Sequence, residues 1–402
     1  QLQVRDLEQC FFNCWVEGID HHEMTLIFAP KPVRIVAEFG YQDQFDVYRK
    51  LKPVYQIPGA PENLEIVSAG PEHRMRRSER ELALSWLTRH LKPAGLLRFD
   101  VDWSDYHSFL TELKQHQAQI DLKHHGLLSF CRKSIATRRP FWRGTAATIR
   151  QVPALKKAFQ AKVRPLVDLQ GKSIFRLQPG RYRLVFTPDY RIPVCICRGQ
   201  GEKGLALLVD EKGLGSAWTQ RQIEKLAAET AWLVAMEVFN TGQLRTSLKP
   251  CREGVFLQRH WRYYSPDIYH AADTFMLGSC PLALTMEEVL TLLVTLKSEK
   301  ERLVFSGRGW PAVGLILLSS VLPAVKKCFA EKIPFSYQEL FDSGYFWFDI
   351  NLVIPGILKY TDLPVIISAR TKTNFYLKNR LKPPERRKKT WRFLTSTFAL
   401  RF

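Results

Sequence analysis

The alternation of apolar and polar residues predicts a chain built of both strands and helices. Two stretches have apolar residues at helical spacing behind a Ser or Thr N-cap, and they predict helices over 78–90 and 219–239. Prolines and glycines are dense between residues 52 and 71, where we expect a loop. Short β-branched and aromatic runs bounded by turn residues predict strands at 26–28, 33–39, 96–103, 173–177, 181–186, 193–197 and 204–209.

The C-terminal part of the chain continues this mixture. Its apolar segments predict helices over 285–296 and 313–327, and strands over 303–306, 345–353 and 363–367. We therefore expect a mixed α/β fold of the α+β type, with two or three lobes in which helices pack on short-stranded sheets. The expected parts are a β-rich N-terminal domain over 1–95, a basic and mainly helical segment over 96–170, a central and C-terminal α+β domain over 171–369, and a basic C-terminal arm over 370–402.

Composition limits the class of protein. Of 402 residues, 46% are hydrophobic and 12% aromatic, which suits a buried core and excludes disordered, collagen-like and coiled-coil chains. The eight cysteines lie mostly in apolar segments, as free thiols do in a reducing compartment, so we expect a cytoplasmic protein. The longest uncharged apolar run, 310–325, is shorter than the ~20 residues of a membrane-spanning helix, so we expect no integral membrane segment.

Positive charge is concentrated in two parts of the chain. In total, 59 Lys and Arg against 39 Asp and Glu give a formal net charge of +20 at pH 7. The first basic window, between Asp121 and Asp168, holds 11 basic residues and no acidic one. The second basic window, residues 370–402, holds 11 basic residues and a single acid, Glu385. Such charge favours a polyanionic partner, most commonly nucleic acid, because an uncompensated surface repels itself.

Both basic windows interleave aromatic rings with Lys and Arg, a combination that can stack bases in a single-strand groove. We therefore predict a nucleic-acid-binding protein, with DNA favoured over RNA, that contacts the phosphate backbone with little sequence preference as one subunit of a multiprotein assembly. The candidate contact residues are Arg132, Lys133, Arg138, Arg139, Trp142, Arg143, Arg150, Lys156, Lys157, Arg386, Arg387, Lys388, Lys389, Trp391 and Arg392. A merely solvated basic face, an acidic protein partner and attachment to an anionic membrane are the alternatives.

Two carboxylates near the end of a predicted strand suggest a different function. Asp100 and Asp102 lie at i and i+2 on one strand face and could hold Mg²⁺ or Mn²⁺. The segment FDVDWSDY resembles the metal-binding strand of the archaeo-eukaryotic primase small subunit, and FSGRG at 305–309 resembles that family's nucleotide-contacting motif, although no His follows it. The later pair SGRGWP and FWFDIN is similar in part to the Toprim fold. These short likenesses assign no family, but they imply a metal-dependent nuclease or nucleotidyltransferase as the alternative function.

The simpler interpretation of Asp100 and Asp102 is structural, as strand-end residues that pair with Arg98. No complete catalytic constellation is visible elsewhere, because a P-loop is absent and no serine or cysteine has a base at readable spacing. We therefore expect no cofactor or metal outside the alternative function. The sequence favours a binding role over an enzymatic one.

Overall fold

The computed structural model describes residues 12–19, 21–37, 42–68, 77–91, 127–160, 166–167, 179–187, 190–245, 266–296, 302–343, 349–370, 372–379 and 381. The chain divides into two compact units. The smaller unit comprises residues 14–122, and the larger unit comprises residues 1–13 and 123–402.

The smaller unit is built around two parallel strands. Its elements are α1 (His21–Leu26), β1 (Val33–Ala37), α2 (Gln42–Gln56), the 3-10 turn η2 (Pro61–Asn63), β2 (Leu64–Ser68) and α3 (Arg77–Leu91). Leu51 and Tyr55 of α2 are fully buried against β2, so α2 continues through Pro53 where the sequence predicts a loop. The predicted strand at 26–28 is instead the end of α1 and the turn after it. The predicted helix at 78–90 is confirmed as α3.

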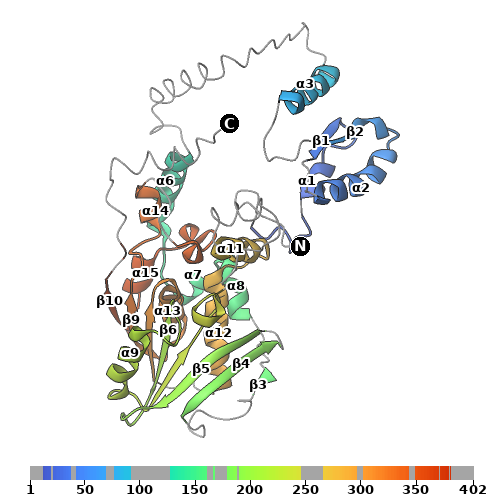
Figure 1. Cartoon of the computed structure of the whole chain (residues 1–402). Helices are drawn as coiled ribbons and strands as arrows, with labels where there is room; N and C mark the ends of the chain where they lie inside the picture. The colour runs from blue at the N-terminus through green and yellow to red at the C-terminus, as the bar shows by residue number, and fades with distance from the viewer. Residues whose placement is uncertain are drawn as a thin grey trace. The chain divides into compact units, whose positions relative to one another are not determined.

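The larger unit contains an eight-stranded mixed sheet in the order β10-β9-β8-β6-β7-β5-β4-β3 (Figure 1). The pairs β3–β4, β4–β5 and β5–β7 are antiparallel, and every pair from β7 to β10 is parallel. The strands are β3 (Leu166–Val167), β4 (Gly180–Thr187), β5 (Tyr190–Arg198), β6 (Leu205–Asp210), β7 (Trp232–Met236), β8 (Leu303–Arg308), β9 (Val325–Glu331) and β10 (Asn374–Lys378). The expected α/β class is confirmed.

Helices cover both faces of this sheet. They are α6 (Leu127–Arg138), α7 (Ala146–Arg150), α8 (Pro153–Gln160), α9 (Ala217–Ala227), α11 (Pro266–Met276), α12 (Pro281–Thr295), α13 (Trp310–Val321), α14 (Gln338–Ser343) and α15 (Leu363–Ser368). Four 3-10 turns complete the unit: η4 (Arg139–Phe141), η6 (Gly242–Leu244), η7 (Ile350–Leu352) and η8 (Ile357–Lys359). Of the helices described, none is by itself long and apolar enough to cross a membrane, and only α11 with α12, bent by 81° between them, meets that test as a pair.

The predicted helix over 219–239 is wrong in its second half. The helix α9 ends at Ala227, and the chain turns at Thr230 into strand β7. All five residues of β7 are buried, because the strand lies between β5 and β6 with both of its faces covered. A strand buried on both faces is apolar at every position and therefore has no period-2 alternation. Its apolar residues happen to continue the helical spacing of α9, which is why the sequence predicts one long helix. The predicted strand at 363–367 is likewise the short helix α15, opened by Asp362 as N-cap.

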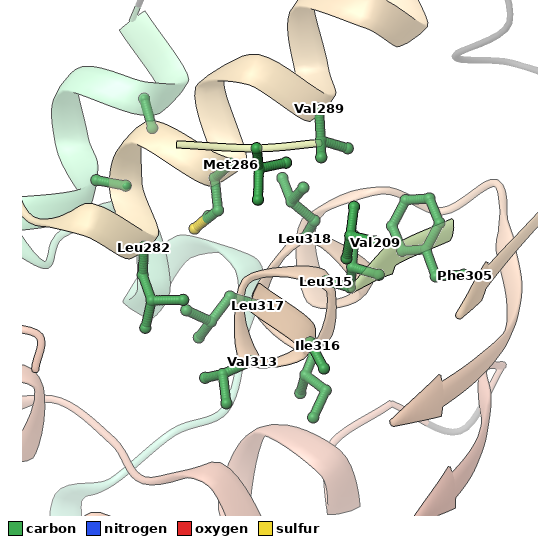
Figure 2. Close-up of a cluster of buried hydrophobic side chains, with 14 of the residues drawn as sticks. Val209, Leu282, Met286, Val289, Phe305, Val313, Leu315, Ile316, Leu317 and Leu318 are labelled. Carbon is green, nitrogen blue, oxygen red and sulfur yellow. The ribbon is translucent and has the colours of Figure 1, made fainter. Parts of the chain in front are cut away.

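The main core lies between the sheet and the pair α12 and α13. Every residue of α13 is buried, so this helix is apolar on all sides. Figure 2 shows Leu315 and Leu318 of α13 lying between Met286 and Val289 of α12 and the ring of Phe305 in β8. This packing holds the end of β8 and the start of α13 in fixed positions, which matters for the site described next.

Candidate functional site

The chain changes direction between β6 and β8, two neighbouring parallel strands. From β6 it continues through α9 to β7 on one side, and from β8 through α13 to β9 on the other. The two helices also lie on opposite faces of the sheet, since α13 packs in the main core and Leu226 of α9 in a separate cluster. Open α/β sheets bind ligands at such a point, in the crevice beyond the carboxyl ends of the strands.

The carboxyl ends of β6 and β8 are joined by a buried ion pair. Asp210 and Arg308 are the last residues of these strands and lie opposite each other in register. Arg308 Nε donates to Asp210 Oδ1 at 3.0 Å, and the second carboxylate oxygen accepts a hydrogen bond from Ser216 Oγ. The Arg308 guanidinium also lies 5.6 Å from the ring centre of Trp218 in α9. The two strand ends are therefore fixed to each other and to α9.

Gly309 forms a sharp turn between β8 and α13. Its backbone has φ 74° and ψ −159°, a region that only glycine adopts without strain. Its N–H donates to the carbonyl of Glu331 in β9 at 2.9 Å. This strand–turn–helix arrangement is the one in which a G-x-S-x-G nucleophile elbow presents its serine. In that spacing Gly307 is the first glycine, Gly309 stands where the serine would stand, and Pro311 replaces the last glycine.

The space above Gly309 is occupied by a carboxylate. A Cβ atom added at Gly309 would overlap Oε2 of Glu211, the residue that follows β6. Burial and the neighbouring Asp210 raise the pKa of Glu211, while the cations Arg308 and Lys332 oppose the increase. The elbow thus carries no side chain of its own, and a carboxylate with increased proton affinity lies where that side chain would be.

A cavity of about 390 Å³ opens beside this turn. It is lined by Glu211, Lys212, Asn240, Gly242, Arg245, Asp267, Trp310, Asp349 and Asn351. Three of its lining residues are joined by hydrogen bonds: Arg245 Nη2 donates to Asp267 Oδ2 at 2.9 Å, and Asn240 Nδ2 donates to Asp267 Oδ1 at 2.7 Å. Nearby, Asn351 Nδ2 donates to Asp349 Oδ1 at 2.9 Å. These groups come from five separate segments, so the cavity is assembled only by the fold.

The buried carboxylate of Glu237 holds two of the loops near this cavity. It follows β7 and accepts from the backbone N–H of Leu214 at 3.2 Å and from that of Gln243 at 2.8 Å. Gly213 and Gly242 both have positive φ, and a Cβ on either would overlap the Glu237 carboxylate. Both positions therefore require glycine for close approach to the acid.

The first basic window lies on the larger unit and takes part in its folding. Ile149 and Leu155, with their neighbours in α7 and α8, are buried in the main core. Trp142 Nε1 donates to the carbonyl of Leu358 at 3.0 Å, and Arg132 Nη2 donates to the carbonyl of Asp342 at 3.3 Å. Lys157 Nζ also donates to a backbone carbonyl, that of Leu277. Its other candidate residues, all exposed, are Lys133, Arg138, Arg139, Arg143, Arg150 and Lys156.

Of the sequence-predicted residues that the structure describes, none lines the cavity beside Gly309. Arg386, Arg387, Lys388, Lys389, Trp391 and Arg392 of the second basic window lie outside the described residues, as do Asp100 and Asp102. Among the residues that the structure describes, no group of three or more His, Cys, Asp and Glu could hold a metal ion. The segment 305–309, which was singled out in the sequence, forms the end of β8 and the turn at Gly309. One other sequence signal of this site is the acidic pair Asp210 and Glu211 at the end of the apolar strand β6. Its contacts depend on the register of β6 with β8, which the sequence does not show.

No family model matches this chain, and no curated protein matches it. Solved structures similar to it include a proposed acetyl xylan esterase from Bacteroides fragilis NCTC 9343, with 14% identity over 57% of this chain and 66% of that one, at a TM-score of 0.40. Acetyl xylan esterase 1 from Thermoanaerobacterium sp. JW/SL YS485 has 14% identity over 63% of this chain and 96% of that one, at a TM-score of 0.33. A cold-adapted esterase from an Arctic intertidal metagenomic library has 10% identity over 54% and 89%, at a TM-score of 0.29.

These comparisons correct the sequence-based function. The prediction of a nucleic-acid-binding protein with DNA as partner is wrong, because the similar structures are esterases. One physical reason for the error is that the charge of the first basic window was interpreted as a binding surface, although some of its side chains have structural contacts. Trp142 and Lys157 donate hydrogen bonds to backbone carbonyls of the larger unit. The Arg139 guanidinium lies 5.9 Å from the ring centre of Trp142, so these two side chains contact each other.

Proposed function

We propose that the larger unit is an α/β-hydrolase-like protein that binds a small, hydroxyl-rich molecule beside Gly309 without a serine nucleophile. The strand order supports this proposal. From β4 to β10 the sheet runs β4-β5-β7-β6-β8-β9-β10, with antiparallel pairs only at β4–β5 and β5–β7, which is the arrangement on which α/β hydrolases place their elbow.

The observation that carries the proposal is the glycine at the elbow. Nucleophilic catalysis at this turn requires an oxygen or sulfur on residue 309, and glycine has neither. The backbone nevertheless keeps the conformation that presents a side chain at the mouth of the cavity. We infer that binding at the crevice is retained where covalent chemistry is not.

The lining of the cavity supports the class of ligand. The carboxylates of Glu211 and Asp349 accept hydrogen bonds, Lys212 and Arg245 donate them, and Trp310 lines the cavity beside them. Alternating donors and acceptors match hydroxyl groups, which do both, and indole rings pack against the apolar faces of sugars and polyols. The volume of about 390 Å³ is at the small end of the range for ligand pockets.

A second candidate function, hydrolysis without a covalent intermediate, is favoured by the position of Glu211. Its carboxylate lies over the elbow with a raised pKa, as a general base requires. In this mechanism Glu211 takes a proton from water while the water oxygen attacks an ester carbonyl and the carbonyl oxygen becomes an oxyanion. The oxyanion then re-forms the carbonyl, the ester C–O bond breaks, and the alcohol leaves with the proton that Glu211 returns. The N–H of Trp310, the first residue of α13, has no intrahelical acceptor and can donate to the developing oxyanion.

Two measurements test these functions. Saturation-transfer NMR with methyl glucoside should give a signal with the wild type that falls several-fold in Glu211→Ala and Arg245→Ala. Glu202→Ala, which changes an exposed carboxylate at the opposite end of β6, is the matched control. Equal signals in all four proteins would show that this cavity does not bind the probe.

The second measurement separates binding from chemistry. A fluorophosphonate probe should not label the protein, and stoichiometric labelling at a cavity serine would overturn the proposal. Turnover of p-nitrophenyl acetate that is lost in Glu211→Gln would establish the second candidate function. Turnover at the rate of the buffer in both proteins would leave binding alone as the function of this site.

A further inference from the structure

A second and larger cavity, of about 830 Å³, lies on the sheet face that carries α9. It is bounded by β4 and β5 on one side and by α9 on the other. The helix α9 packs against β6 and β7, and β4 and β5 line the cavity beside it. No residue that lines the cavity beside Gly309 also lines this one, although Leu214 and Gln243, whose backbone N–H groups are held by Glu237, do line it.

The strand register explains which side chains face it. Arg181 and Arg183 of β4 lie opposite Cys195 and Pro193 of β5, and directly opposite residues of an antiparallel pair point to the same face. Arg191 lies two residues before Pro193 and therefore shares that face. The strand alternation thus places three guanidinium groups beside an apolar strip.

The cavity combines positive charge with an apolar floor. Arg181, Arg183 and Arg191 line it, and among the described residues that do so none is acidic. Within the described part of the chain, Arg181 and Arg183 take part in no ion pair. The floor is formed by side chains such as Ala235 of β7 and Ile223 of α9. The like charges of Arg181 and Arg183 beside one hollow repel each other unless an anion is bound between them.

We propose that this cavity binds an amphiphilic monoanion, with a carboxylate on the arginines and an alkyl chain along the apolar floor. Arginine suits this ligand because its planar fork makes two parallel hydrogen bonds to a carboxylate. The alkyl chain is favoured because Ala235, Ile223 and Leu214 offer apolar surface that water would otherwise cover. The proposal is independent of the function proposed for the cavity beside Gly309.

The experiment compares three probes that share a twelve-carbon chain: dodecanoate, dodecanol and dodecyltrimethylammonium, each below its aggregation concentration. Calorimetry on the full chain should show saturable binding of dodecanoate, binding at least roughly tenfold weaker for dodecanol, and none for the cation. Cys195 lines the cavity and is half-buried, so dodecanoate should also slow its alkylation by iodoacetamide. Peptide mass spectrometry gives that rate, with Cys14 of the smaller unit as internal reference.

Charge-reversal variants locate the site. Arg181→Glu with Arg183→Glu should weaken dodecanoate binding at least roughly tenfold and abolish protection of Cys195. The double variant Lys133→Glu and Lys156→Glu carries the same charge change at exposed positions elsewhere and should bind as the wild type does. Arg181→Gln with Arg183→Gln repeats the test without introducing acids. Equal binding of dodecanol and dodecanoate, or unchanged binding in the arginine variants, would overturn the proposal.

Discussion

Replacing Glu288 with glutamine should remove a pH dependence from the stability of the larger unit. Glu288 belongs to α12, is 3% exposed, and accepts hydrogen bonds from Tyr190 Oη and from the N–H of Phe239, the latter at 2.8 Å. Burial raises its pKa from 4.5 to about 8, despite the opposing effect of these two hydrogen bonds. The side chain is therefore largely protonated in the folded protein at neutral pH.

The sign of the effect follows from proton binding. In the unfolded chain Glu288 ionises near pH 4.5, whereas in the folded protein it keeps its proton until about pH 8. The folded state binds the extra proton between these values, so the free energy of unfolding falls as pH rises through that window. Each tenfold difference in proton affinity is worth about 1.4 kcal/mol, which gives up to about 5 kcal/mol by pH 9.

Glutamine tests this reasoning because it is isosteric and neutral at every pH. Its carbonyl can accept from Phe239 and its amide can donate to the Tyr190 oxygen, so both partners stay satisfied. Urea unfolding monitored by circular dichroism at several pH values between 5 and 9.5 should show similar stabilities for both proteins at the acid end. Towards pH 9 Glu288→Gln should become the more stable by several kcal/mol.

The exposed Glu224→Gln of α9 serves as control and should follow the wild type at every pH. If the difference between Glu288→Gln and the wild type is constant from pH 5 to 9.5, the carboxyl group is not buried as the structure has it, and the argument fails.

Three further variants test the geometry of the carboxyl ends, each by urea unfolding. Gly309→Ala should destabilise the protein by about 1–3 kcal/mol, because alanine is strained at φ 74° and its Cβ overlaps Glu211; an unchanged midpoint would rule out this turn. Arg308→Met should lower stability by about 3–5 kcal/mol by leaving Asp210 buried without its cation, and Asp210→Asn in the same chain should recover part of that loss. Leu315→Ala should lower it by about 2–5 kcal/mol through the cavity it leaves between α13 and the sheet, and a smaller loss would mean that α13 is not held there.

The sequence pattern was sufficient to predict those helices and strands whose apolar residues recur at helical or strand spacing and whose ends carry turn or capping residues. Helix α3 and strand β1 follow directly from amphipathic spacing and from a β-branched run. It was insufficient where burial on both faces erases the pattern, as in β7, which continues the helical apolar spacing of α9. In the same way α15 is short and mostly apolar, and its N-cap Asp362 and the proline in its first turn were the local signs that it is a helix.

The site could not be predicted for two separate reasons. The first is that its parts come from the segments after β6 and after β7, from α11, from α13 and from η7, and no sequence spacing shows that Glu211 and Asp349 line one cavity. The second is that the sequence motif for such a strand–turn–helix site contains a serine, and residue 309 is glycine. The first basic window misled in the opposite way, because composition reports how much charge a segment carries and not whether Trp142 or Lys157 is already bonded to its own fold.

The sharp turn at Gly309 is required by the packing of β8 against α13. A Cβ on Gly307 would lie 2.8 Å from the Cα of Ala312, so β8 and α13 approach more closely than any other residue at position 307 allows. The chain must therefore reverse within Gly309 to bring α13 back onto the sheet, where its buried residues complete the main core. If catalysis were the reason for the sharp turn, a variant that relaxes it would affect only activity. Since the turn also positions a fully buried helix, Gly309→Ala should lower stability whether or not any substrate is ever hydrolysed, and the shape of the elbow is not by itself a sign of catalysis.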